Sequence, residues 1–259
     1  PPTGEFPPAA PYFSRTWERT DKPVADNAAD RTWMWGPSAF TEAMREEYAE
    51  GHNNSREVQY FDKSRMEITT DQSIDPSEIW FVTNGLLVNE LTTGNLQLGD
   101  TTFEEYNPAI GNVAGDPEGT SGPTYAAMSL LRDANPHAAG SVITATVDRF
   151  GNTGNDPLRS SEGVTAAQYV EDTDHTVASV FWDFMNSDGM VYENGQLVNG
   201  DLFVNPFYAT GFPVTEAYWT TVPVGGVSTQ VLVQAFERRV LTYTPSNAAG
   251  WQVEAGNVG

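Results

Sequence analysis

The chain has 259 residues, 39% of them hydrophobic, with 7 Trp, 10 Tyr and 13 Phe, which is enough apolar material for a sizeable core and excludes a disordered polymer. Its 35 acidic residues outnumber its 13 basic ones, and the net charge of -22 argues against nucleic acid or an anionic membrane surface as a partner, because both need clustered Lys and Arg. The absence of cysteine excludes disulfides and thiolate chemistry, and no apolar run approaches the roughly 20 residues that cross a bilayer, so we expect no membrane insertion.

The first part of the chain predicts a tether followed by strands and one helix. Residues 1–11 are rich in proline, which favours extended geometry and suits a spacer or a strand given to a neighbour; the beginning resembles the mature end of an exported protein. Residues 31–37 read as an aromatic strand, residues 38–49 as a short helix and residues 57–68 as a strand. Residues 80–91 read as a hairpin that turns at Asn84-Gly85.

The rest of the chain alternates helices with short strands. Residues 124–132 predict a helix that Pro123 opens, and residues 141–148 alternate as a strand. Residues 175–185 predict an apolar helix, which His175 caps or packs against. The Asn-Gly steps at 194–195 and 199–200 predict turns between very short strands, and Gly225-Gly226 separates strands over 218–224 and 229–244.

Three sequence blocks occur twice in the same order. Thr-Glu-Ala stands at 41–43 and 215–217, a Val-Gln-x-Phe-acid-base block at 58–63 and 233–238, and a Trp-led block at 80–85 and 251–256. Internal similarity of this kind indicates a duplicated unit. We predict an α+β fold of two related lobes, made of short antiparallel strands with short helices and separated by an inserted helix–strand segment. The expected parts are a Pro-rich N-terminal arm (1–11), repeat unit A (12–99), a middle segment (100–176) and repeat unit B (177–259).

The blocks at 32–37, 58–67, 207–213 and 250–259 resemble a family of uncharacterised exported proteins of Chloroflexota bacteria, over nearly the whole chain. Each unit is also distantly similar to the LGFP-type repeat of secreted, wall-associated bacterial proteins. Phe212-Pro213 matches the start of that repeat, whereas residues 37–40 of the first unit depart from it. The resemblance implies an extracellular or envelope-associated module and supplies no catalytic residues.

The common enzyme motifs are missing from the sequence. It has no nucleophile elbow, no metalloprotease helix and no phosphate-binding loop, and its three histidines are scattered. Two carboxylates flanking a glycosidic bond would suffice for a hydrolase, and the best candidates are Glu216 and Glu237, which recur as Glu42 and Asp62. The alternative is a structural role for these residues. Glu42 and Glu216, which each follow a Thr, would form local hydrogen bonds, and Glu237-Arg238 and Asp62-Lys63 would be cross-strand ion pairs.

One acidic loop predicts a cation site. Asp148, Asn152, Asn155 and Asp156 place several hard oxygen ligands within nine residues, and the glycines between them allow the chain to curl around Ca²⁺. The loop does not follow the EF-hand pattern, and ordinary Asx turns explain the same residues.

Aromatic residues offer a second kind of site. Trp33, Trp35, Tyr208 and Trp219 are candidates for a platform on which sugars stack, although aromatic residues at strand spacing are more often part of the core. Asn53 begins a glycosylation sequon in a polar segment.

These patterns together predict a secreted, non-enzymatic structural or assembly protein of an extracellular layer, filament or matrix, located outside the cell or at its surface. Its partners would be further copies of itself, joined through strand edges or the arm, or cell-surface components. One alternative is an extracellular glycan- or cell-wall-binding module that uses aromatic residues between the lobes. The other is a carboxylate-dependent glycan hydrolase.

Overall fold

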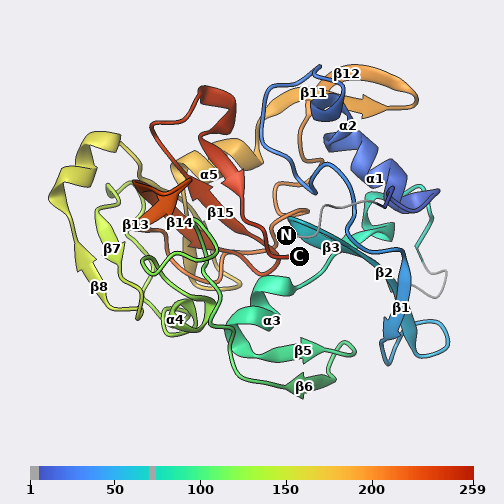
Figure 1. Ribbon diagram of the computed structural model, residues 1–259, viewed down its shortest axis with the longest axis horizontal. Helices are drawn as coiled ribbons and strands as arrows, with labels where there is room; N and C mark the ends of the chain where they lie inside the picture. Colours follow the sequence, from blue (N-terminus) through green and yellow to red (C-terminus); the bar gives the residue numbers. More distant parts are fainter. Residues whose placement is uncertain (1–5, 70–73) are drawn as a thin grey trace.

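The computed structural model describes residues 6–69 and 74–259 as a mixed α+β fold, with many short antiparallel strands and a few short helices (Figure 1). The first of two larger sheets is an antiparallel meander in the order β1-β2-β3-β4. Its strands are β1 (Met44–Glu47), β2 (Ser55–Phe61), β3 (Ser64–Ile68) and β4 (Thr83–Asn84).

The second larger sheet has six strands in the order β16-β15-β14-β13-β7-β8. All its neighbours are antiparallel except β13 and β7, which pair in parallel through Trp219 and Thr146. Its strands are β7 (Ala145–Val147), β8 (Thr153–Asn155), β13 (Tyr218–Val224), β14 (Val227–Ala235), β15 (Val240–Tyr243) and β16 (Val253–Ala255).

Short helices and two-stranded ribbons surround the sheets. The helices are α1 (Tyr12–Thr20), α2 (Lys22–Ala25), α3 (Leu87–Thr93), α4 (Tyr125–Ser129) and α5 (Ser179–Met185), with 3₁₀ turns η1 (Ile79–Phe81), η2 (Pro157–Glu162) and η3 (Ala249–Trp251). The ribbons are β5 (Asn95–Gln97) with β6 (Phe103–Glu105), β9 (Ala166–Val170) with β10 (His175–Ala178), and β11 (Asp188–Glu193) with β12 (Gln196–Asp201).

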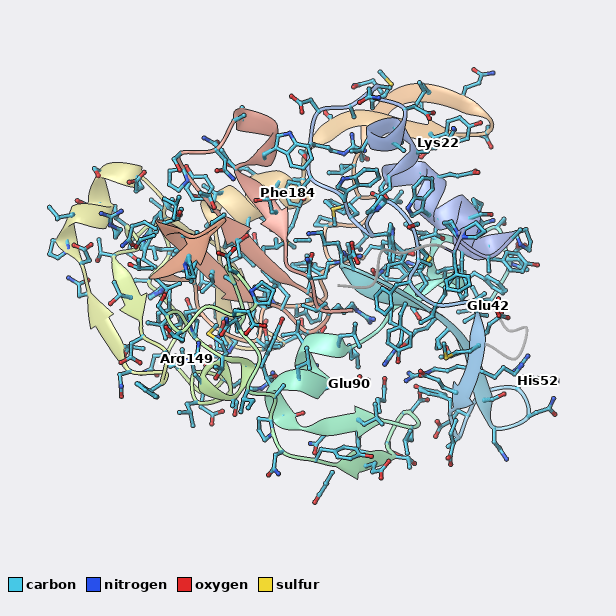
Figure 2. The ribbon with its side chains drawn as sticks, viewed as in Figure 1. Lys22, Glu42, His52, Glu90, Arg149 and Phe184 are labelled. Carbon is cyan, nitrogen blue, oxygen red and sulfur yellow. The ribbon has the colours of Figure 1, made fainter. Side chains whose placement is uncertain are left out.

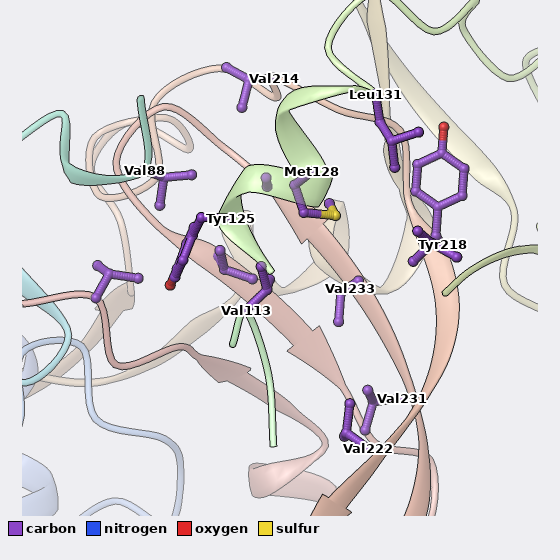
Figure 3. Packing of buried hydrophobic residues seen from close by; sticks show 14 of the residues in the cluster. Val88, Val113, Tyr125, Met128, Leu131, Val214, Tyr218, Val222, Val231 and Val233 are labelled. Carbon is purple, nitrogen blue, oxygen red and sulfur yellow. The ribbon is translucent and has the colours of Figure 1, made fainter. Parts of the chain in front are cut away.

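The second sheet is buried on both faces because its strands alternate between two apolar clusters. In β14, Val231 and Val233 join a cluster that α3 and α4 cover, where Met128 is fully buried (Figure 3). Leu232, between those two valines, joins the opposite cluster with Phe181 of α5. A third cluster lies between the first sheet, α1 and β11. Period-two alternation therefore places β14 between two layers of helix.

The two larger sheets share one pairing pattern. Met44 pairs with Val58 in the β1–β2 ladder, and Tyr218 pairs with Val233 in the β13–β14 ladder, so residues at matching positions of the repeated sequence blocks have the same register. The next hairpin of each sheet turns through an acidic and a basic residue, and a 3₁₀ turn stands directly before each last strand.

A buried glutamine holds a neighbouring segment against each sheet in the same way. Gln59 and Gln234 are both about 1% exposed or less. Each side-chain amide accepts from one backbone N–H and donates to two backbone carbonyls. Gln59 accepts from Ala9 and donates to Pro7 and Thr41. Gln234 accepts from Ala178 and donates to Thr176 and Thr215. Residues 7–9 of the predicted arm thus pack against the first sheet of the same chain, and Phe6 pairs with Ala39. Residues 1–5 lie outside the described part.

Several predicted elements differ from the structure. Residues 31–37 form no strand because the carboxylate of Asp21 accepts the backbone N–H groups of Met34, Trp35 and Gly36. Residues 38–49 form no helix; part of them becomes β1, an edge strand on β2. The predicted second hairpin arm at 86–91 is helix α3, which ends at Gly94 with φ 78°.

The remaining differences lie at turns, whereas other predicted elements agree with the structure. The segments 57–68 and 229–244 are each two strands rather than one, with turns at 62–63 and 237–238. Asn199-Gly200 lies inside β12, whereas Asn194-Gly195 forms the expected turn, with φ 51° and 79°. Strand β13 has the predicted bounds, α4 lies within 124–132, and residues 175–185 divide into β10 and α5.

None of the helices that the structure describes combines the length and the apolar character needed to cross a membrane.

Candidate functional site

A cavity of about 450 Å³ lies between helix α1, the β11–β12 hairpin and the loop at 202–209, and we call it the α1–β11 cavity. These elements are far apart in the sequence, and α1 lies beside the hairpin at one end of the molecule (Figure 1). The aromatic residues in its wall are Trp35, Tyr192, Phe203 and Tyr208.

Arg19 fixes the two sides of the α1–β11 cavity to each other. Its Nε donates to Glu193 at 2.9 Å, its Nη1 to the carbonyl of Leu202 and its Nη2 to the carbonyl of Asp201, both at 2.7 Å. The guanidinium fork spans one side chain and two backbone groups, so it holds the hairpin against α1. The cavity therefore has a defined shape.

Arg239 forms the floor of the cavity and is fully buried. Its guanidinium lies 4.8 Å from the centre of the Trp35 ring and donates to the carbonyls of Met34 and Ala209 and to Asn84 Oδ1. Burial lowers the pKa of Arg239 to about 9, although the nearby carboxylate of Asp21 acts in the opposite direction. A cation is thus kept in the interior by neutral oxygen atoms, an aromatic face and the nearby charge of Asp21.

Two of the four predicted sugar-stacking residues belong to this cavity and two do not. Trp35 and Tyr208 line it, but with exposed fractions of 2% and 8% they leave little ring surface open to a ligand. Tyr208 donates to the carbonyl of Val82 at 2.5 Å. Trp219 is fully buried in the second sheet and donates to the carbonyl of Ile143, and Trp33 is half-buried elsewhere. A single platform made of all four is therefore wrong.

Glu216 is fully buried in a hydrogen-bonded cluster. Its Oε1 accepts from the backbone of Thr176 at 2.8 Å and faces His175 Nδ1 at 3.1 Å, while its Oε2 accepts from the backbone of His137 at 2.9 Å. His175 Nε2 in turn faces the carbonyl of Arg132 at 2.9 Å. This carboxylate connects β10 to the segment before β13, and no substrate-sized opening reaches it through the α1–β11 cavity.

The other three carboxylates weighed for hydrolysis lie apart from Glu216. Glu42 is exposed near the first sheet (Figure 2). Glu237 accepts from the backbone N–H of Phe212 at 2.9 Å, and Asp62 occupies the equivalent turn of the first sheet. Both lie in turns, so the cross-strand ion pairs expected with Arg238 and Lys63 are wrong. None of the four lines the α1–β11 cavity.

The acidic loop uses its oxygen atoms in local turns. Asp148 accepts from the backbone of Phe150 and from the backbone and side chain of Asn152, and these bonds, led by the one from the Asn152 side chain, lower the pKa of Asp148. Asn155 accepts from Thr144, and Asp156 caps η2 at Leu158 and pairs with Arg159. Over residues 6–69 and 74–259, no three His, Asp or Glu side chains are placed to hold a metal ion.

Asn53 lies exposed in the turn between β1 and β2, with φ 56°. Its sequon is therefore open to solvent, and its glycosylation stays a prediction.

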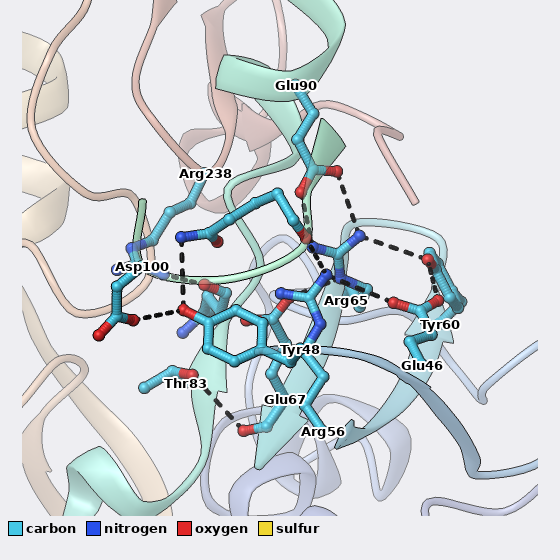
Figure 4. Close-up of polar contacts among 12 residues, drawn as sticks. Glu46, Tyr48, Arg56, Tyr60, Arg65, Glu67, Thr83, Glu90, Asp100 and Arg238 are labelled. Carbon is cyan, nitrogen blue, oxygen red and sulfur yellow. Dashed lines mark hydrogen bonds and ion pairs between the residues drawn. The ribbon is translucent and has the colours of Figure 1, made fainter. Parts of the chain in front are cut away.

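A second group of charged residues, on the first sheet, is closed by its own contacts (Figure 4). Arg65 bonds Glu67 at 2.6 Å and Glu90 at 2.8 Å, and Arg56 lies 3.1 Å from Glu67. Burial alone would lower the pKa of Arg65, but the carboxylates of Glu67 and Glu90 hold it well above its ordinary value. Each charge has an opposite neighbour, so this cluster joins the sheet to α3 and is not a ligand site.

Comparisons with protein-family models, curated proteins and solved structures give no match to this chain. The resemblance to exported proteins with LGFP-like repeats stays a prediction.

Sequence reasoning missed most of the cavity. Arg15, Arg19, Tyr192, Glu193 and Phe203 all line it, yet they come from a helix, a hairpin and the start of the following loop, which no repeated block includes. The Asn-Gly turn at 194–195 located the hairpin, but nothing in the sequence placed that hairpin against α1.

Proposed function

We propose that the protein is a secreted, non-enzymatic binding module that takes a saccharide from an extracellular glycan or cell wall in the α1–β11 cavity. The observation that carries this proposal is the cavity itself: about 450 Å³, with Trp35, Tyr192, Phe203 and Tyr208 beside charged side chains. This volume falls within the roughly 300–1,000 Å³ of small-molecule sites.

The composition of the wall favours a saccharide over a purely apolar ligand. The aromatic side chains of the wall, of which Tyr192 is the most exposed, supply apolar contact for the C–H groups of a sugar ring. Arg15, Glu18 and Glu193 supply donors and acceptors at the same wall for its hydroxyl groups. Rigid attachment of the hairpin by Arg19 reduces the entropy lost on binding.

A blocking variant tests the proposal by isothermal titration calorimetry with a panel of neutral, amino and uronic disaccharides. Val204 lines the cavity and is 57% exposed, so Val204→Trp places a large ring over the cavity without disturbing the core. We expect at least one disaccharide to bind and this variant to weaken it roughly tenfold or more, which is about 1.4 kcal/mol. Val227→Trp, at a 66% exposed position at the start of β14, is the matched control. Binding that survives Val204→Trp, or no binding by the whole panel, would contradict the proposal.

We propose further that the two larger sheets belong to two related lobes descended from one unit. Their shared register and their two buried glutamines support this. So do reciprocal contacts: Lys63 Nζ donates to the carbonyl of Ala255 at 2.8 Å, and its counterpart Arg238 donates to the carbonyl of Asn84, the counterpart of Ala255. Contacts that repeat in both directions are typical of a two-fold interface.

Self-association into a layer or filament is the second candidate function. One observation favours it: Phe6 exchanges backbone hydrogen bonds with Ala39, which itself pairs with Phe61 of β2. The arm adds to a strand edge, and such an addition can in principle be made to a second copy. Particle size by light scattering, compared between the intact chain and one lacking residues 1–11, tests it; assembly that persists without the arm would contradict it. Calcium bridging between copies stays a weaker part of this proposal.

A further inference from the structure

The charge of the α1–β11 cavity is opposite to that of the molecule. The whole chain has 35 acidic and 13 basic residues, whereas the cavity wall has three arginines and two glutamates: Arg15, Arg19, Arg239, Glu18 and Glu193. Positive charge gathered in a concave, partly desolvated place acts on a ligand more strongly than the same charge on an open surface.

The two glutamates do not neutralise the three arginines. Glu193 is paired with Arg19 at 2.9 Å, which leaves Glu18 as the other carboxylate of a wall that holds two further arginines. Arg239 makes no ion pair with any carboxylate in the described part of the chain: its hydrogen bonds go to backbone carbonyls and to Asn84, and the buried carboxylate of Asp21 acts on it only from beyond ion-pair distance. A bound anion would be stabilised by a positive charge that the protein leaves partly uncompensated.

Arg15 is the cation most available to a ligand. It is exposed at the wall, and within residues 6–69 and 74–259 its side chain gives one hydrogen bond, from Nη2 to the carbonyl of Pro76 at 2.6 Å. Asp75 interacts with it electrostatically without forming an ion pair. Because guanidinium carries five N–H donors in a planar fork, Arg15 keeps enough of them for a carboxylate.

From this arrangement we propose that the saccharide is anionic and carries a carboxylate, as uronic acids do, with Arg15 bonding the carboxylate and Arg19 and Arg239 stabilising its charge. This inference rests on the proposed function and narrows the class of ligand. Arginine is the residue best matched to a carboxylate, because its fork donates two parallel hydrogen bonds.

The test compares each ligand with its own uncharged form. Disaccharides of galacturonic, glucuronic and mannuronic acid, and their methyl esters, are titrated into the intact protein by calorimetry. We expect at least one acid to bind roughly tenfold more tightly than its ester, and Arg15→Gln to remove most of that difference. Arg45→Gln, at an exposed position on β1 with a single bond to Ser55, is the control and leaves the difference unchanged.

The outcomes separate this inference from the proposed function. Acid and ester that bind equally, with both sensitive to Val204→Trp, would overturn the anionic ligand and leave the saccharide site in place. A preference for the acid that Arg15→Gln does not reduce would overturn the role of Arg15 and with it the proposal. Binding by none of these acids would overturn the proposal, and a neutral sugar that still binds would keep the proposed function.

Discussion

At the scale of single residues, the best-defined features are buried polar side chains that hold backbone segments together. Gln234 is fully buried and satisfies two carbonyls and one N–H group. Gln59 makes the equivalent bonds, but two of its partners, Pro7 and Ala9, are less buried. Equivalent residues therefore carry unequal parts of the stability, because water can replace lost bonds on the first sheet more easily.

Replacing these glutamines measures that inequality. We expect Gln234→Leu to lower the free energy of unfolding by about 3 kcal/mol, since it leaves three buried backbone groups unpaired, and Gln59→Leu to lower it by about 1 kcal/mol. Urea denaturation followed by circular dichroism gives both values. Equal losses for the two variants would contradict the view that water cannot replace the lost hydrogen bonds of Thr176 and Ala178.

Glu216 allows the structural and the hydrolytic interpretations to be separated. In Glu216→Gln the new amide donor faces the backbone N–H of either Thr176 or His137, so we expect a loss of about 2–3 kcal/mol in urea denaturation. A variant that keeps its stability and loses the ability to cleave a glycan would support the hydrolase instead.

At the scale of elements, one turn, one strand and helix α4 were predictable from local signals, whereas strand pairing, the helix expected at 38–49 and helix α3 were not. The Asn194-Gly195 turn and strand β13 follow from residue type and alternation. Residues 31–37 have the aromatic content of a strand, yet the carboxylate of Asp21, ten or more residues earlier, takes their N–H groups. A local sequence pattern cannot predict a contact between residues this far apart in the sequence.

Contacts between residues far apart in the sequence also explain why the repeated blocks did not predict which side chains each sheet buries. The β2–β3 face with Arg56 and Arg65 corresponds in register to the β14–β15 face with Val231 and Val240. The first sheet buries an ion-paired cluster where the second buries valines. The repeated blocks occupy matching positions of the two sheets, but the segments packed on them differ: Glu90 of α3 faces the arginines, whereas apolar residues of α3 and α4 face the valines.

Two matched glycines test the role of the β11–β12 hairpin. Gly195 and Gly226 both have φ near 79° in two-residue turns, and an added Cβ meets nothing within 4 Å at either. We expect Gly195→Ala and Gly226→Ala each to cost roughly 1 kcal/mol of stability from the left-handed backbone alone. Calorimetry should then find weaker saccharide binding only for Gly195→Ala, whose turn borders the cavity. Equal effects on binding would argue against the hairpin as a cavity wall.

At the scale of the whole molecule, the two larger sheets are fastened through each other's turns. Besides the contacts of Lys63 and Arg238, Gly259 N donates to the carbonyl of Asp62, and Asn89 N donates to the carbonyl of Glu237. The segment after the last strand of each sheet thus contacts the hairpin turn of the other sheet, at 62–63 or 237–238. Neither sheet can open fully without breaking contacts that belong to both.

This arrangement predicts that the two sheets unfold together. In native-state hydrogen exchange, amides of β2 and β14 should exchange with the same opening free energy, within about 1 kcal/mol, because only global unfolding exposes both. Exchange from β2 at a much lower free energy than from β14 would contradict it and indicate lobes that open independently.

The α1–β11 cavity depends on the same arrangement, since its floor, Arg239, comes from the second sheet and its wall, Trp35 and α1, from the start of the chain. A crystal structure of the protein with a bound uronic disaccharide is the most direct measurement. We predict density for the sugar inside the cavity, with its carboxylate within about 3 Å of the Arg15 guanidinium. Density for the sugar elsewhere on the molecule, with the cavity left to solvent, would contradict the account.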